Sequence, residues 1–80
     1  MHPRVKDLET LDDYKLKLFF ENGEIKIFDV RPFLEKGIFK ELRDKELFKN
    51  VKVFLGSVKW QNGQDFCPDT LYIEAKSQNN

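Results

Sequence analysis

The clearest pattern of apolar and polar positions lies between residues 14 and 30. From Tyr14 to Phe20 the two kinds of residue largely alternate, which is the period of a β-strand. The dipeptide Asn22-Gly23 follows, and both of its residues tolerate the positive φ angles of a type I′ turn. The pattern therefore predicts a β-hairpin over residues 14–30 with a two-residue turn.

That turn also predicts which residues face one another across the hairpin. Phe20 lies opposite Ile25, and Leu18 opposite Ile27, on the face expected to pack on the core. The other face then carries a stripe of lysines and phenylalanines: Lys15, Lys17, Phe19, Lys26 and Phe28. Three interpretations of this stripe are open. It forms a surface for another protein or a second copy, it stacks on single-stranded nucleic acid, or short helices cover its phenylalanines while the lysines extend outward.

The same register places Asp29 on the inward face, opposite Leu16. A carboxylate in that position needs a partner, because burying an unpaired charge is costly. Arg31 is one candidate, and the free amides of a helical turn that begins at Pro32 are another. An anchored structural aspartate is the expectation, with acid–base chemistry as the alternative.

Shorter signals surround this hairpin. Residues 5–8 suit an edge strand, because charged side chains protect an exposed edge. Residues 32–36 are typical of one helical turn, with proline at its start and Gly37 at its end. Residues 38–48 predict one or two further turns, and Asp44 is placed to cap the second.

The second half of the chain predicts another hairpin and a final helix. Over residues 51–60, a turn at Leu55-Gly56 would place Val53 opposite Val58, and Val51 opposite Trp60. Asn62-Gly63 then turns the chain again. A helical turn follows from Pro68 to Tyr72 or Ala75.

Together these elements predict a small two-layer α+β domain. An antiparallel sheet of two hairpins plus an N-terminal edge strand carries short helical turns on one face. Eighty residues suit one domain, which we place at residues 1–76, with a flexible tail at 77–80.

Composition narrows the possible partners and compartments. The chain has 14 basic and 14 acidic residues, so no overall field favours nucleic acid or an anionic membrane. A single cysteine favours a reducing cytoplasm, and the N-terminus lacks the pattern of a signal peptide. One histidine and one cysteine cannot supply a typical zinc site, so neither metal nor cofactor is expected.

Candidate catalytic groups are few. Cys67 and His2 would have to meet for nucleophilic catalysis, but His2 lies at the chain end, and we expect an incidental or structural thiol. Asp65 and Asp69 flank Pro68 and are expected to accept hydrogen bonds from the free amides of its helical turn. The alternative is a ligand site, in which Asp29, Asp65, Asp69 and Trp60 converge.

The order of these motifs resembles a known family. The residues that carry the resemblance are Asn22-Gly23, Phe28-Asp29-Val30-Arg31-Pro32, Gly37-Ile38-Phe39, Leu42, Phe48, Trp60-Gln61-Asn62-Gly63, Asp65, Pro68 and Leu71-Tyr72. They resemble the small bacterial domain-of-unknown-function family 2442. Asp29, Arg31, Trp60, Asn62, Gly63, Asp65, Pro68, Asp69 and Tyr72 form its structural motif in this chain. Gln61 departs from the family pattern, which has proline after the tryptophan.

The resemblance implies a compact α+β domain without an established activity. Some relatives carry an additional helix-turn-helix segment, for which this chain has no length, so direct binding to DNA is not carried over. Other relatives accompany a second small protein in a proposed toxin–antitoxin pair.

We therefore expect a cytoplasmic protein-interaction module without catalytic activity, which binds another protein or itself through the lysine–phenylalanine stripe. One alternative is an antitoxin-like partner of a small toxin. Another is a small-ligand-binding protein or enzyme that uses Asp29, Asp65, Asp69 and Trp60.

Overall fold

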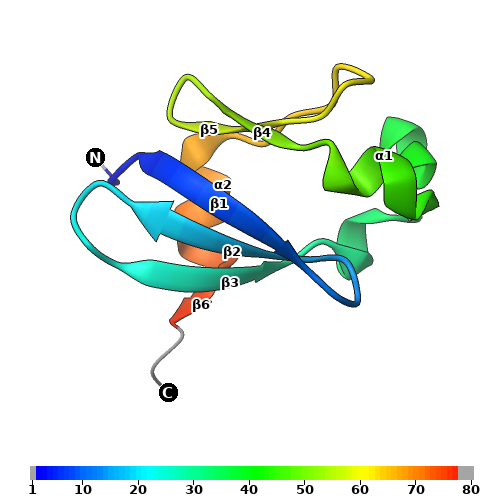
Figure 1. Ribbon diagram of the computed structural model, residues 1–80. Coiled ribbons are helices and arrows are strands. Elements are labelled where there is room, and N and C mark those ends of the chain that lie inside the picture. Colours follow the sequence, from blue (N-terminus) through cyan, green and yellow to red (C-terminus); the bar gives the residue numbers. More distant parts are fainter. Residues whose placement is uncertain (1, 78–80) are drawn as a thin grey trace.

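The structure, a computed structural model, describes residues 2–77 and contains two antiparallel sheets (Figure 1). The first has the strand order β1-β2-β3-β6, and the second pairs β4 with β5. The strands are β1 (Val5–Leu11), β2 (Lys15–Phe20), β3 (Ile25–Asp29), β4 (Lys52–Phe54), β5 (Ser57–Lys59) and β6 (Lys76–Ser77). The predicted N-terminal edge strand is confirmed, and it extends to Leu11.

The helical segments begin near the predicted signals, but the first ends at Phe33, and Gly37 starts the second segment instead of ending the first. They are η1 (Arg31–Phe33), η2 (Gly37–Arg43), α1 (Lys45–Lys49) and α2 (Pro68–Glu74). The Asp44 carboxylate accepts a hydrogen bond of 2.9 Å from the Glu46 amide and caps α1, as expected. Pro68 occupies the first turn of α2, where its missing N–H costs no hydrogen bond.

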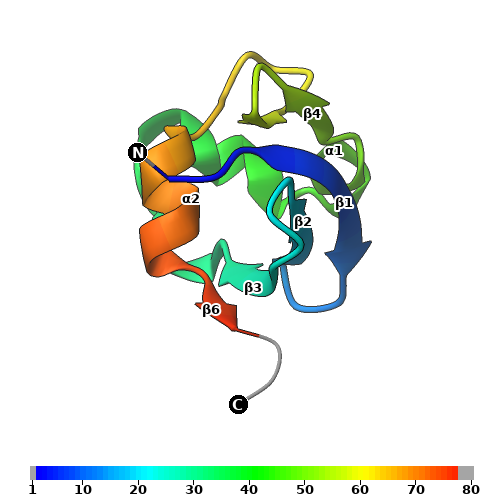
Figure 2. The same cartoon turned by 90° about the vertical axis from the view of Figure 1, so that its left-hand side faces the viewer.

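The core lies between the first sheet, the second sheet and the helices (Figure 2). β2 contributes its alternate residues Leu16, Leu18 and Phe20, all fully buried. Their covering residues come from α2 and from the second half of the chain, and include Val58, Trp60, Phe66, Leu71 and Ala75. The arrangement is a small α+β domain, which confirms the predicted fold class.

The register of the first hairpin differs from the predicted one by one residue. Leu16 pairs with Phe28, and Leu18 pairs with Lys26. The cause is a loop of three residues, 21–23, instead of two. Gly23 alone in this loop has a positive φ, of 92°, and the Phe20 amide bonds the Glu24 carbonyl at 2.9 Å. This is a type I turn followed by a left-handed glycine, so the predicted type I′ turn was wrong.

A shift of one residue exchanges the two faces of β3. Phe28 therefore lies in the core with only 1% of its surface exposed, and Lys26 is on the same inner face. Asp29 pairs with Lys15 and lies on the outer face, so its predicted inward position was wrong. The five residues of the predicted lysine–phenylalanine stripe consequently do not share one face.

The second hairpin has the predicted register, with Val53 opposite Val58. Leu55 and Gly56 both have positive φ angles, 50° and 79°, as a two-residue type I′ turn requires. The prediction that both hairpins join one sheet was wrong, because β4 and β5 form a separate sheet. The two sheets meet where the Val5 amide donates a 3.0 Å hydrogen bond to the Gly56 carbonyl.

No helix within residues 2–77 is long and apolar enough to cross a membrane. Ser77 ends β6, and the rest of the predicted tail lies outside the described residues.

Candidate interaction surfaces

The first candidate surface is the side of the first sheet that faces away from the core. It is formed by Asp7, Glu9 and Leu11 of β1, Lys15, Lys17 and Phe19 of β2, Ile25, Ile27 and Asp29 of β3, and Lys76 of β6. We call it the outer sheet face. Figure 1 shows no other element of residues 2–77 lying across it. Of its apolar side chains, Phe19, Ile25 and Ile27 are half-buried, and Leu11 is exposed.

Asp29 has the partner that the sequence predicted, although it points outward. Arg31 donates to its carboxylate through Nη2 at 2.8 Å and through Nε at 3.0 Å, and the Arg31 amide adds a bond of 2.9 Å. The side-chain hydrogen bond from Arg31 is the largest effect on this group and holds the pKa of Asp29 below its ordinary value. The pair anchors the end of β3 to η1, which favours the structural interpretation of Asp29.

The Lys26 side chain binds to Tyr72 of α2, so it is not available to a partner as predicted. Its ammonium donates a 2.9 Å hydrogen bond to the Tyr72 carbonyl and lies 3.5 Å from the centroid of the Tyr72 ring. The Tyr72 hydroxyl in turn donates to Glu24 Oε1 at 2.5 Å. This bond lowers the pKa of Glu24 and raises the pKa of Tyr72, because it favours the carboxylate and the neutral phenol. The cluster joins the first hairpin to α2.

The second candidate surface is the end of the second hairpin, which we call the hairpin tip and define as Val53, Phe54 and Leu55. These consecutive side chains are 36%, 47% and 76% exposed. The sequence pattern did not predict a site here, because it identified Val53 only as the cross-strand partner of Val58. The available signal was a run of three apolar residues leading into a turn.

A hollow of about 650 Å³ lies beside the hairpin tip. It is lined by Asn50, Lys52, Val53, Phe54, Lys59, Trp60 and Gln61. The Lys59 ammonium is 4.6 Å from the centroid of the Phe54 ring, a cation–π contact that holds both side chains at the rim. The hollow therefore combines an apolar floor with two positive charges from opposite strands.

Trp60 belongs to the core, although its edge reaches this hollow. It is 2% exposed, and its indole N–H donates to the Phe48 carbonyl at 2.9 Å. Asn62 and Gly63 follow Trp60 in a loop that has the same hydrogen-bond pattern as the loop of the first hairpin. The Trp60 amide bonds the Gln64 carbonyl, and Asn62 Oδ1 accepts from the Gln64 amide at 3.0 Å. The turn predicted here is confirmed.

The aspartates proposed for a ligand site are not brought together with Trp60. Asp65 lies on an isolated bridge opposite Lys59, Asp69 lies in the first turn of α2, and neither they nor Asp29 line the hollow. Among residues 2–77, no hydrogen bond involves the Asp65 or Asp69 carboxylate, so the expected capping is not observed. The same residues contain no group of three metal-ligating side chains. Cys67 is exposed, and His2 stacks on Tyr72 instead.

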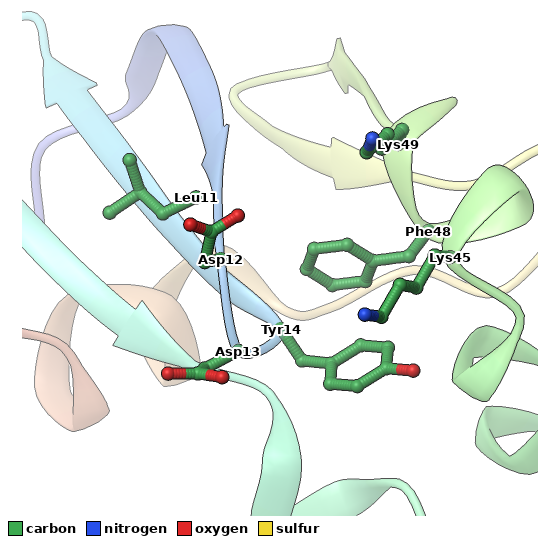
Figure 3. Close-up of a pocket in the computed structure, with 7 residues that line it drawn as sticks. All are labelled: Leu11, Asp12, Asp13, Tyr14, Lys45, Phe48 and Lys49. Atoms are coloured by element: carbon green, nitrogen blue, oxygen red, sulfur yellow. The ribbon is translucent and has the colours of Figure 1, made fainter.

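A second pocket, of about 400 Å³, lies between the β1–β2 loop and α1 (Figure 3). Asp12 and Asp13 border it on the loop side, while Lys45 extends along the aromatic rings on the helix side. The Tyr14 hydroxyl donates to the Arg43 carbonyl, which ties the loop to the end of η2. The pocket carries charges of both signs and has no nucleophile positioned by a base.

These features define a small α+β domain with two partly apolar surfaces, and its predicted acidic residues are dispersed or structurally engaged. The chain belongs to the family described as "Protein of unknown function (DUF2442)", whose model matches residues 5–77. Searches of curated proteins and of solved structures found no match. The family membership agrees with the resemblance seen in the motifs and assigns no activity.

Proposed function

We propose that this domain is a protein-interaction module that presents its hairpin tip to a partner protein. The observation that carries the proposal is Leu55, which is 76% exposed and has a φ of 50°. A left-handed conformation costs a residue such as leucine about 1–2 kcal/mol, and asparagine or glycine is the usual choice in this turn. Neither turn formation nor core packing explains leucine at this position, whereas contact with a partner does.

The adjacent side chains extend the same argument. Phe54 is half-exposed. It precedes Leu55 and lines the hollow together with Trp60. Moving an exposed Leu or Phe side chain fully out of water contributes roughly 1.5–3 kcal/mol. Two such side chains beside a ready hollow match the arrangement of an interface anchor, in which a few apolar groups supply most of the affinity.

The charges around the tip indicate the chemistry of the partner. Between residues 45 and 61 the chain carries four lysines, Lys45, Lys49, Lys52 and Lys59, against a single carboxylate, Glu46. Lys52 and Lys59 are directly opposite each other on the strands that border the hollow. A partner segment with an apolar anchor flanked by carboxylates complements this surface. Such a module acts by binding alone and requires neither a catalytic group nor a cofactor.

The proposal is tested by capturing partners from the native host with the purified domain as bait. A second bait, the tip variant, carries Phe54→Thr and Leu55→Asn. These substitutions keep the strand and turn preferences but remove the apolar anchors. Ile73→Ser is the matched control, because Ile73 is 63% exposed on α2, away from the tip. We expect the tip variant to lose a protein that the wild type and the control both retain.

A direct measurement then uses the purified partner and isothermal titration calorimetry. Lys52→Glu should weaken binding at low salt and have less effect at high salt, because the lysine acts through charge. Equal capture by the tip variant and the wild type would contradict the proposal, as would capture that disappears on nuclease treatment. A captured small toxin encoded beside this chain would identify the module as antitoxin-like.

A further inference from the structure

The outer sheet face has apolar residues where an open sheet normally has polar ones. An antiparallel sheet with one solvated face usually alternates apolar residues inward and polar residues outward. Here Phe19 and Ile25 form a directly opposed pair on the solvent side, and Ile27 lies next to them on β3. Figure 2 shows α2 on the other side of the strands and the second sheet beside β1. The described residues leave this apolar centre uncovered.

The strand registers arrange the face in rows that run across the sheet. One row contains Glu9, Lys17, Ile27 and Lys76, from β1 through to β6. Beside it lies a row of Leu11, Lys15 and Asp29, and on the other side a row of Asp7, Phe19 and Ile25. Acidic residues therefore occupy the β1 edge, a lysine occupies the β6 edge, and three carboxylates balance three lysines over the whole face.

We infer that the outer sheet face is the interface of a two-fold dimer of this chain, with the axis parallel to the strands and between β2 and β3. Rotation about that axis lays each row on itself with its direction reversed. Glu9 then faces Lys76 of the second copy, Lys15 faces Asp29, and Phe19 faces Ile25. Each of these three contacts occurs twice and joins opposite charges or apolar groups, whereas Lys17 faces Ile27 and can lay only its alkyl chain against it. Two sheets pack in this way about 10 Å apart, with strands about 30° from alignment.

Charge selects this orientation and this occupant. An axis across the strands would lay β1 on β1 and set Asp7 and Glu9 against their own copies, which is repulsive. A strongly charged partner would gain little from a face whose charges cancel. A second copy in the reversed orientation instead pairs Glu9 with Lys76 and Lys15 with Asp29. This inference concerns a surface apart from the hairpin tip, so it stands whether or not the tip binds a partner.

Charge reversal tests the axis directly. We expect sedimentation velocity to show a concentration-dependent dimer between micromolar and millimolar protein. Glu9→Lys alone and Lys76→Glu alone should each weaken it about tenfold, because each creates two like-charge contacts. The double variant Glu9→Lys/Lys76→Glu should restore the wild-type association. Within one chain these residues are three strands, or about 14 Å, apart, so the restoration cannot arise inside a monomer.

The apolar centre supplies a second, independent test. Phe19→Thr/Ile25→Thr keeps strand preference and removes the central contact, so the protein should be monomeric throughout this range while its circular dichroism is unchanged. The tip variant Phe54→Thr/Leu55→Asn should dimerise like the wild type. A wild type that stays monomeric at millimolar concentration and low salt would overturn the inference. A charge-swapped double variant that fails to restore the dimer would also overturn it. So would a wild-type dimer that the tip variant abolishes.

Discussion

Leu55 combines a left-handed backbone with an exposed apolar side chain, and leucine is an unfavourable residue for both. Its φ of 50° is relieved by asparagine, which adopts this conformation at lower cost. We expect Leu55→Asn to raise the free energy of unfolding by about 0.5–1 kcal/mol, which is a few degrees in Tm for a domain of this size. Urea denaturation measures the change.

Gly56 provides the control for that substitution. Its φ is 79°, and a Cβ there would approach the Arg4 side chain to 2.9 Å. Gly56→Ala should therefore destabilise the domain, although it alters the same turn. A Leu55→Asn variant less stable than the wild type would show that Leu55 packs on the fold, and it would remove the main support for the tip as a binding surface.

The Tyr72–Glu24 hydrogen bond makes stability depend on pH from both sides. Glu24 has a lowered pKa, so its contribution is present above the ordinary value of 4.5 and is lost as the pH falls through the lower folded value. Tyr72 has a raised pKa, so its contribution is present below 10.0 and is lost as the pH rises through the higher folded value.

Tyr72→Phe removes this bond and keeps the ring beneath Lys26. We expect the Glu24 pKa, followed by carboxyl NMR, to move back up towards 4.5. The difference in stability between wild type and variant should also narrow as the solution is acidified. Asp29, whose pKa depends first on Arg31, should titrate unchanged and serves as the internal reference.

At the scale of the elements, the strands and helices follow from the sequence better than their faces do. The alternation of apolar and polar residues predicted β2 and β3, and Pro68 predicted the start of α2, because each signal is local. The dipeptide Asn-Gly suits both a two-residue and a three-residue loop, and the choice between them shifts the register by one. That single residue decides whether Phe28 lies in the core or outside, so the candidate contact set could not be predicted from the pattern.

The two Asn-Gly loops test this explanation of the register. Gly23 and Gly63 have φ angles of 92° and 94°, and a Cβ at either position would meet nothing within 4 Å. Backbone strain is then the main cost of substitution. We expect Gly23→Ala and Gly63→Ala to lower the free energy of unfolding by similar amounts, about 1–2 kcal/mol each. A large difference between them in urea denaturation would contradict the equivalence of the loops.

Two phenylalanines on opposite faces of the first hairpin test the register itself. Phe28→Ala empties a core site that also contacts Phe33 and Phe66, so it should cost about 3–5 kcal/mol. Phe19→Ala removes a half-buried outer side chain and should cost well under half as much. The predicted type I′ register would give both residues the same environment, so comparable losses in denaturant unfolding would favour it.

At the scale of the whole molecule, the sequence predicts the class of fold but not the division into two sheets. Alternation over residues 51–60 gives a hairpin, and nothing in it says which edge the hairpin joins. The division depends on long-range contacts, such as the bond between the Val5 amide and the Gly56 carbonyl. The hairpin tip is exposed because of this division, since β4 and β5 project as a separate pair of strands.

Trp60 gives the molecule a built-in optical reporter. It is the only tryptophan in the chain, so intrinsic emission excited at the indole band comes from one known position. Because its edge lines the hollow beside the hairpin tip, a ligand that enters there alters the emission without any attached dye. A molecule that associates only across the outer sheet face leaves it unchanged. One fluorescence titration can therefore tell which of the two surfaces a newly found partner occupies.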